Sequence, residues 1–170
     1  YNELHNLLLK FGTIDDEAMK FYGPILVLNY GKGERMLKVE VSNREHPNHY
    51  EVRSLLGTDI RVMTLSDMFA HKLCALGERI TPRDIYDVWF FLQNRTEINA
   101  EIVHLRTGMS VSEYAQQCAA KVRSYSSRML MQGLGEVLLD NQSKNFAREQ
   151  LIPETASALE LFALCPLIAE

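Results

Sequence analysis

The chain has 170 residues, of which 46% are hydrophobic and 24% charged, and its formal net charge at pH 7 is -4. A chain of this length buries roughly two thirds of its unfolded surface on folding, so its core requires no metal or disulfide for stability. The negative charge argues against indiscriminate binding to nucleic acid, because that binding depends on Lys and Arg neutralising phosphates.

The first predicted elements are an amphipathic helix and a β-hairpin. Residues 2–11 form the helix, with Gly12 as its C-terminal cap, because apolar residues recur there at helical spacing. These apolar residues are Leu4, Leu7, Leu8 and Phe11. The hairpin has strands at residues 24–30 and 35–42, joined by a glycine-containing turn at residues 31–34.

The second strand of this hairpin has two different faces. Leu37, Val39 and Val41 alternate with Lys38 and Glu40, so one face is apolar and the other carries a carboxylate beside a lysine. A carboxylate on a strand can help to hold Mg²⁺, which prefers oxygen ligands and shares them with substrate phosphates. Alternatively, the lysine and the glutamate are the solvated face of an antiparallel strand.

A loop and a second pair of strands lead into the helical part of the chain. Residues 44–49 are polar and read as the loop, and residues 50–56 and 59–65 read as short strands. The period then changes, and residues 67–79 are predicted to be helical.

Helical periodicity continues toward the end of the chain. Thr81 is the predicted N-cap and Pro82 the first residue of a helix that runs to about Gln93. Ser110 and Glu113 match a capping box at the start of another helix. Further helices are predicted at residues 110–127 and 153–164, whereas residues 128–148 are ambiguous.

Two cations share one side of the predicted helix at residues 67–79. Lys72 and Arg79 are stacked there by their spacing, and the opposite stripe of Phe69, Leu73 and Leu76 is the expected core face. Such a pair of cations can neutralise a triphosphate and favour the charge that develops during nucleotidyl transfer. The alternative is an exposed amphipathic helix whose cations lie near its C-terminus, where the helix dipole favours them.

Two acids lie on one side of the next predicted helix. Asp84 and Asp87 are three residues apart, opposite the apolar side of that helix. Each also has a structural alternative, because Asp84 can complete a capping interaction with Thr81 and Asp87 can pair with Arg83. Together with the two cations of the preceding helix, these residues form a dense mixed-charge cluster, which is unusual for plain surface.

Other chemistries lack support in the sequence. Cys74, Cys118 and Cys165 are odd in number and form no CxxC, which argues against a disulfide framework and a thiolate zinc site and favours a reducing, cytoplasmic compartment. The histidines lack metal-ligand spacing, and no GxSxG or Walker A motif is present. The longest apolar stretch, residues 161–169, is far below the roughly 20 residues that cross a bilayer, so no membrane partner is expected.

The order of the charged motifs resembles the AbiEii/AbiGii nucleotidyltransferase toxin family. Members of that family pair a strand acid with a segment of the form K-x-x-A-L, then R, then P-R-D-x-Y-D-x-W. This chain has KVEV at residues 38–41, KLCAL at residues 72–76, Arg79, and PRDIYDVW at residues 82–89. The resemblance covers roughly residues 24–95, and its second segment is fairly specific.

The resemblance implies a fold and an activity. The expected fold is α/β (α+β), with a partial nucleotidyltransferase-like core of twisted sheet and packed helices at residues 1–95 and a helical region at residues 96–170. The implied activity is Mg²⁺-dependent transfer of a nucleotide from an NTP to an acceptor, which is tRNA in some related toxins. A cognate antitoxin is the implied protein partner, within a phage-defence or toxin–antitoxin pair.

The resemblance also assigns roles to individual residues. Glu40 matches the third metal-site carboxylate, Lys72 the contact to the nucleotide phosphates, and Asp84 the motif acid of the second helix. The predicted catalytic residues are therefore Lys72, Asp84 and Asp87, the predicted nucleotide-binding residues are Lys72, Arg79 and Arg83, and the predicted metal ligand is Glu40.

One departure from the family pattern bears on activity. The family's Gly-Gly/Ser turn and the D-x-D pair that follows it are absent, and the contiguous Asp15 and Asp16 precede every predicted strand. Two metal ions need several acidic oxygens held close together, which Glu40 alone does not supply. We therefore expect this chain to be catalytically silent even where a longer parent is active. The rival hypothesis is a non-catalytic protein-binding module whose charged cluster is a structural ion network.

Overall fold

The computed structural model describes residues 1–43, 46–134, 138 and 140–169. It divides into two compact units, Tyr1–His46 and Pro47–Glu170, which we describe in turn. Helices and two small antiparallel sheets occur together, which confirms the predicted mixed α/β (α+β) class. The predicted domain division lies between residues 95 and 96, inside the second of these units, and it stays a prediction.

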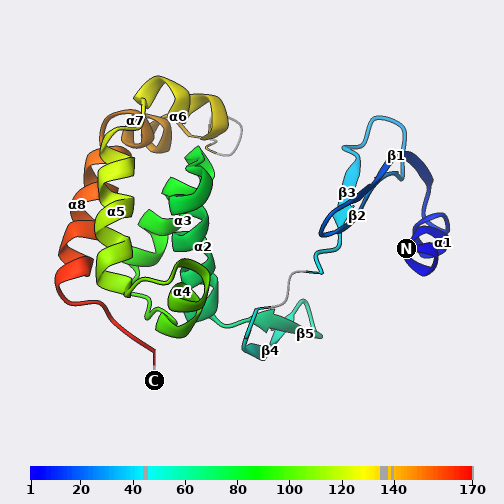
Figure 1. The fold of residues 1–170 in the computed structure, drawn as a ribbon. Helices are drawn as coiled ribbons and strands as arrows, with labels where there is room; N and C mark the ends of the chain where they lie inside the picture. Colours follow the sequence, from blue (N-terminus) through cyan, green and yellow to red (C-terminus); the bar gives the residue numbers. More distant parts are fainter. Residues whose placement is uncertain (44–45, 135–137, 139, 170) are drawn as a thin grey trace. The chain divides into compact units, whose positions relative to one another are not determined.

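The first unit is a short helix followed by a three-stranded antiparallel sheet in the order β1-β2-β3 (Figure 1). Its elements are α1 (Asn2–Leu8), β1 (Thr13–Lys20), β2 (Gly23–Asn29) and β3 (Leu37–Glu40). The helix ends earlier than predicted, with Leu9 rather than Gly12 as its C-cap. Gly12 is needed for a different reason, because a Cβ there would lie 2.1 Å from the main-chain oxygen of Asn29.

Strand β1 was not predicted, and it corrects the expectation that Asp15 and Asp16 precede every strand. Both aspartates lie within β1, which pairs with β2 and has an irregular register between Ile14 and Asp16. The strand is mostly exposed and lacks alternating apolar residues. Its main-chain hydrogen bonds to β2 hold it at the sheet edge, and hydrophobic periodicity does not report such bonds.

The core of the first unit is small and centres on β2. Leu26 and Leu28 of β2 are buried together with Leu8 of α1. In β3 the predicted apolar face is only partly realised, since Val39 packs against this core whereas Leu37 is 49% exposed.

A β-hairpin opens the second unit. Strands β4 (Tyr50–Leu55) and β5 (Thr58–Met63) lie where two short strands were predicted, and they pair antiparallel. Leu56 and Gly57 both have positive φ, 50° and 79°, which is the backbone that a tight two-residue hairpin turn requires. Of the loop predicted at residues 44–49, residues 44 and 45 lie outside the described part, and residues 46–49 have no regular structure.

Seven helices follow the hairpin in the described part of the second unit. They are α2 (Leu65–Arg79), α3 (Pro82–Gln93), α4 (Ala100–Thr107), α5 (Val111–Arg123), α6 (Ser127–Leu134), α7 (Asn141–Glu149) and α8 (Leu151–Leu164). The predicted helices are confirmed, including the Ser110–Glu113 capping box of α5, but the helix predicted at residues 110–127 ends at Arg123. Helix α4 was not predicted because it is short and weakly amphipathic. In the ambiguous stretch at residues 128–148, residues 135–137 and 139 lie outside the described part.

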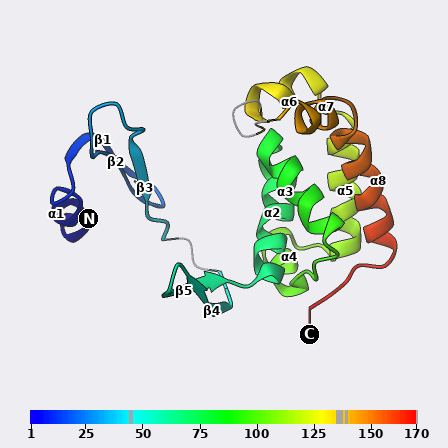
Figure 2. The same ribbon diagram turned by 180° about the vertical axis from the view of Figure 1, so that it is seen from behind.

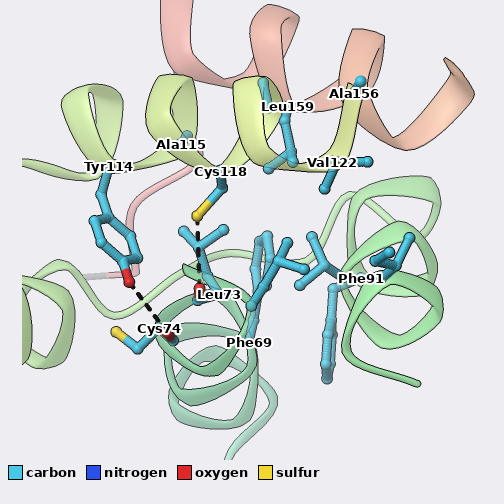
Figure 3. Close-up of a cluster of buried hydrophobic side chains, with 14 of the residues drawn as sticks. Phe69, Leu73, Cys74, Phe91, Tyr114, Ala115, Cys118, Val122, Ala156 and Leu159 are labelled. Carbon is cyan, nitrogen blue, oxygen red and sulfur yellow. Dashed lines mark hydrogen bonds between the residues drawn. The ribbon is translucent and has the colours of Figure 1, made fainter. Parts of the chain in front are cut away.

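Helices α2, α3, α5 and α8 lie side by side and enclose the core of this unit (Figures 1 and 2). Both views place α4 at one end of these helices and α6 with α7 at the other. In the core, Phe69 and Leu73 of α2 face Cys118 and Val122 of α5 (Figure 3). None of the described helices has the length and apolar character that crossing a membrane demands.

The contact between α2 and α5 is close enough to require a glycine. A Cβ at Gly77 would lie 2.0 Å from the hydroxyl oxygen of Tyr114. That hydroxyl donates a hydrogen bond to the carbonyl of Cys74 at 3.0 Å (Figure 3). Lys121 of α5 donates to the carbonyl of Gly77. These contacts fix α2 against α5 and thereby hold the polar face of α2 in place.

Candidate functional site

The turn between α2 and α3 brings charged residues of both helices together. Helix α2 ends at Arg79, and Ile80 has a positive φ of 39°. Helix α3 begins as predicted, with Pro82 in its first turn and the Thr81 side chain accepting a hydrogen bond from the N–H of Asp84 at 3.2 Å. This short connection places the end of α2 next to the start of α3.

Asp84 is the buried centre of this cluster, with only 1% of its surface exposed. Arg79 donates two hydrogen bonds to its carboxylate, from Nε to Oδ2 at 2.9 Å and from Nη2 to Oδ1 at 3.1 Å. The Thr81 hydroxyl donates a third to Oδ2 at 2.6 Å, and the Lys72 ammonium lies 4.0 Å from Oδ1. The prediction that Lys72 and Arg79 share one side of α2 agrees with their common approach to this carboxylate.

The pKa of Asp84 reports the balance of these contacts. Burial acts to raise the pKa, because a charged carboxylate loses its hydration. The hydrogen bonds from Arg79 and Thr81 and the charges of Arg79 and Lys72 outweigh burial, so the pKa is lowered. Asp84 is therefore held as a carboxylate at neutral pH.

Asp87, one turn further along α3, is half-buried and pairs with a cation of the other helix. Its Oδ2 lies 2.6 Å from the Lys72 ammonium. The structure thus provides Asp87 with Lys72 as its partner, where the sequence offered Arg83. Arg83 is exposed at the start of α3. Four predicted site residues come together here, namely Lys72, Arg79, Asp84 and Asp87.

A second buried acid lies in the same unit and was missed in the sequence. Asp67 in the first turn of α2 is fully buried. Its carboxylate accepts hydrogen bonds from the main-chain N–H of His49 and, at 2.7 Å, from the Asn99 side chain. Burial acts to raise its pKa, but these hydrogen bonds and the His49 ring outweigh burial and lower it. These partners are 18 and 32 residues away in the chain, so no local pattern identifies them.

His71, one turn after Asp67 in α2, anchors the loop before β4. Arg106 donates from Nη1 to Nδ1 of His71 at 2.9 Å, so Nδ1 is the acceptor nitrogen of that ring. Nε2 of His71 then carries the proton and donates to Asn48 at 2.7 Å. Arg106 also bonds Glu78 at 2.7 Å. His71 therefore links the loop to α2 and α4.

Glu40, the predicted metal ligand, lies in the first unit. It is opposite Ile25 in the sheet register, and its Oε2 lies 2.7 Å from the Lys38 ammonium. The structure therefore agrees with a charged face on β3. Lys72 and Asp84 belong to the second unit, and the role of Glu40 as a metal ligand stays a prediction.

The cluster around Asp84 does not form a Mg²⁺ site. Among the residues that the structure describes, no three His, Cys, Asp or Glu side chains form a group that could hold a metal ion. The oxygens of Asp84 already accept from Arg79 and Thr81, and Asp87 is paired with Lys72. A Mg²⁺ site needs several oxygens free to converge on the ion. We therefore derive no step through a metal.

Comparison with known proteins identifies a family. The family model described as "Nucleotidyl transferase AbiEii toxin, Type IV TA system" matches residues 8–162, which include both compact units in large part. Neither curated proteins nor solved structures provide a match to this chain.

Proposed function

We propose that this chain, which belongs to the AbiEii nucleotidyl transferase toxin family, supplies the triphosphate-binding corner of an enzyme that transfers a nucleotide from an NTP to an acceptor. The family is one of nucleotidyltransferase toxins of type IV toxin–antitoxin systems. The ligand of this triphosphate-binding region and the residues that bind it are our proposal.

One observation carries the proposal. Lys72 and Arg79 of α2 are held beside the buried Asp84 of α3, yet their side chains are 40% and 63% exposed. Cations whose charged groups are held by acids on one side and are partly exposed to solvent can meet an incoming polyanion. A triphosphate carries several negative charges, so it suits a site with more than one cation.

The roles follow from exposure and charge. Lys72 and Arg79 contact the triphosphate, and Arg83 at the exposed start of α3 adds a third cation. The N-terminus of α3 itself favours negative charge. Asp84 holds these cations in the site, and Asp87, the other acid of the predicted catalytic group, pairs with Lys72.

The finer features of the activity are proposals of the same kind. Mg²⁺ is the expected ion, with Glu40 as one ligand, and it would require further acids that the described residues do not bring together. An RNA, with tRNA as the first candidate, is the expected acceptor, and a cognate antitoxin the expected protein partner. Phage defence and a cytoplasmic location complete the expectation.

The test is label transfer by the natural protein that contains these residues. With an α-labelled NTP, Mg²⁺ and tRNA, Lys72→Ala should reduce transfer by about 100-fold or more, as expected for loss of charge stabilisation in a transition state. Lys32→Ala, which removes an exposed lysine from the turn before β3, is the matched control and should retain activity. Unchanged transfer by Lys72→Ala with an unchanged melting temperature would reject the site.

A non-catalytic protein-binding module is the second candidate. It is favoured by one observation, because Asp84 has its oxygens occupied by Arg79 and Thr81 as in a purely structural network. Under this alternative, Asp84→Asn should lower stability but leave the affinity for an NTP unchanged. Isothermal titration of an NTP into the unaltered chain and into Asp84→Asn distinguishes the two candidates.

A further inference from the structure

The two aspartates of α3 differ in how firmly they are held. The carboxylate of Asp84 is 1% exposed and accepts three hydrogen bonds from Arg79 and Thr81. The side chain of Asp87 is 36% exposed, and its ion pair with Lys72 is its one salt bridge among the described residues. Asp84 is thus held firmly in the fold, whereas the ion pair of Asp87 can be exchanged for another partner of Lys72.

Lys72 is the cation that the two acids share, and it lies much closer to the exchangeable one. Its ammonium is 2.6 Å from Asp87 but 4.0 Å from Asp84. The Lys72 side chain is 40% exposed, so water screens its pair with Asp87 and keeps that pair weak. A polyphosphate carries more charge than one carboxylate and can compete for the same ammonium.

We propose that Asp87 is an internal competitor for the phosphate ligand of Lys72. In the free protein the Asp87 carboxylate forms an ion pair with the Lys72 ammonium. When a nucleoside triphosphate binds, the Lys72 ammonium leaves Asp87 and pairs with a phosphate oxygen, while Arg79 stays hydrogen-bonded to Asp84. Asp87 therefore sets how tightly the site binds a polyphosphate. This inference rests on the proposed function, because it assumes that Lys72 meets phosphate.

The competition makes an unusual prediction about an acid in a candidate catalytic group. Removing the negative charge of Asp87 should strengthen polyphosphate binding, because Lys72 no longer leaves a carboxylate in order to bind. The gain should be about fivefold, which corresponds to the upper range for a partly exposed ion pair. Replacing a residue that only stabilised the fold, or that contacted the ligand favourably, would not strengthen polyphosphate binding.

The experiment is isothermal titration of inorganic tripolyphosphate into the full chain, in metal-free buffer with a chelator. Asp87→Asn should bind about fivefold more tightly than the unaltered chain. Asp59→Asn, which removes an exposed acid from β5, is the matched control for net charge and should bind as the unaltered chain does. Lys72→Gln and the double variant Lys72→Gln/Asp87→Asn should bind equally weakly, because the gain requires the lysine.

The outcomes separate this inference from the proposed function. If the unaltered chain binds tripolyphosphate through Lys72 but Asp87→Asn binds no more tightly, the competition is wrong and the proposed site stands. An equal gain in Asp59→Asn would also overturn the competition, since net charge alone would explain it. If neither the unaltered chain nor Asp87→Asn binds tripolyphosphate, the proposed function and this inference both fail.

Discussion

Asp67 and Asp84 occupy equivalent positions in two successive helices but have different surroundings. Each is the third residue of its helix after a threonine N-cap, and each is almost completely buried. Asp67 accepts from His49 and Asn99, which join a loop and α4 to α2. Asp84 accepts from Arg79 and lies near Lys72, so its neighbours are cations with exposed side chains.

The difference teaches that a buried acid is not by itself the mark of a site. Both carboxylates are charged and satisfied, and both have lowered pKa values. Exposure alone does not separate them, since the His49 side chain beside Asp67 is 65% exposed. What distinguishes Asp84 is that its exposed partners are a lysine and an arginine, which can contact an anionic ligand as well as the acid. The Asp67 region joins elements, whereas the Asp84 region also presents charge.

The largest expected effect separates the two acids by stability. Asp67→Ala leaves the main-chain N–H of His49 and the amide of Asn99 without their acceptor, and should cost about 3 kcal/mol of unfolding free energy. Asp84→Ala should cost less, about 2 kcal/mol, because Arg79 can turn to water. Urea denaturation measures both. A larger loss for Asp84→Ala would reverse the comparison.

Ligand binding should separate them in the opposite sense. Asp84→Ala frees Arg79 and Lys72 from their fixed positions and should weaken tripolyphosphate binding by about tenfold, as for loss of a charged contact. Asp67→Asn, which is isosteric with the wild-type acid, should leave the affinity within about twofold. Titration at a temperature where both variants are folded is the measurement, and equal losses would remove the distinction.

Acid should destabilise the second unit through both carboxyl groups. Their folded pKa values are lowered, so each contributes stability above the unfolded value of about 4. That contribution is lost as the pH falls below about 4 and through the folded pKa. Unfolding free energies measured between pH 7 and pH 3 should fall less steeply in Asp67→Asn or Asp84→Asn. A slope equal to that of the unaltered chain would contradict the assigned contacts.

The smallest expected effect concerns the core that holds both acids in place. Burial raises the pKa of Cys74 to about 11 and that of Cys118 to about 12, whereas Cys165 is exposed. Only Cys165 should react quickly with iodoacetamide at pH 8, as shown by the mass of the intact protein. Rapid modification of Cys118 would show that α2 and α5 separate readily.

The sequence predicted those parts of the site that depend on local pattern. The Thr81 cap, Pro82 and the approach of Asp84 to that cap follow from residues within one turn of each other. Helical spacing placed Lys72 and Arg79 on one side, and both reach Asp84. The partner of Asp87 depended on how α2 packs on α3, so sequence spacing suggested Arg83 where the structure has Lys72.

The parts that could not be predicted depend on contacts between distant residues. Strand β1 lacks apolar alternation and exists through hydrogen bonds to β2, and Asp67 is satisfied by residues far away in the chain. The role of Glu40 as a metal ligand was a prediction from resemblance and is still one. The domain division between residues 95 and 96 also stays a prediction.

The most direct test asks whether phosphate reaches Lys72. The full chain is treated with acetic anhydride in the presence and absence of tripolyphosphate, and acetylation at each lysine is quantified by mass spectrometry. We predict that tripolyphosphate protects Lys72 while Lys32, on the exposed turn before β3, reacts at the same rate in both samples. Equal acetylation of Lys72 with and without tripolyphosphate, at a concentration that saturates binding, would contradict the account.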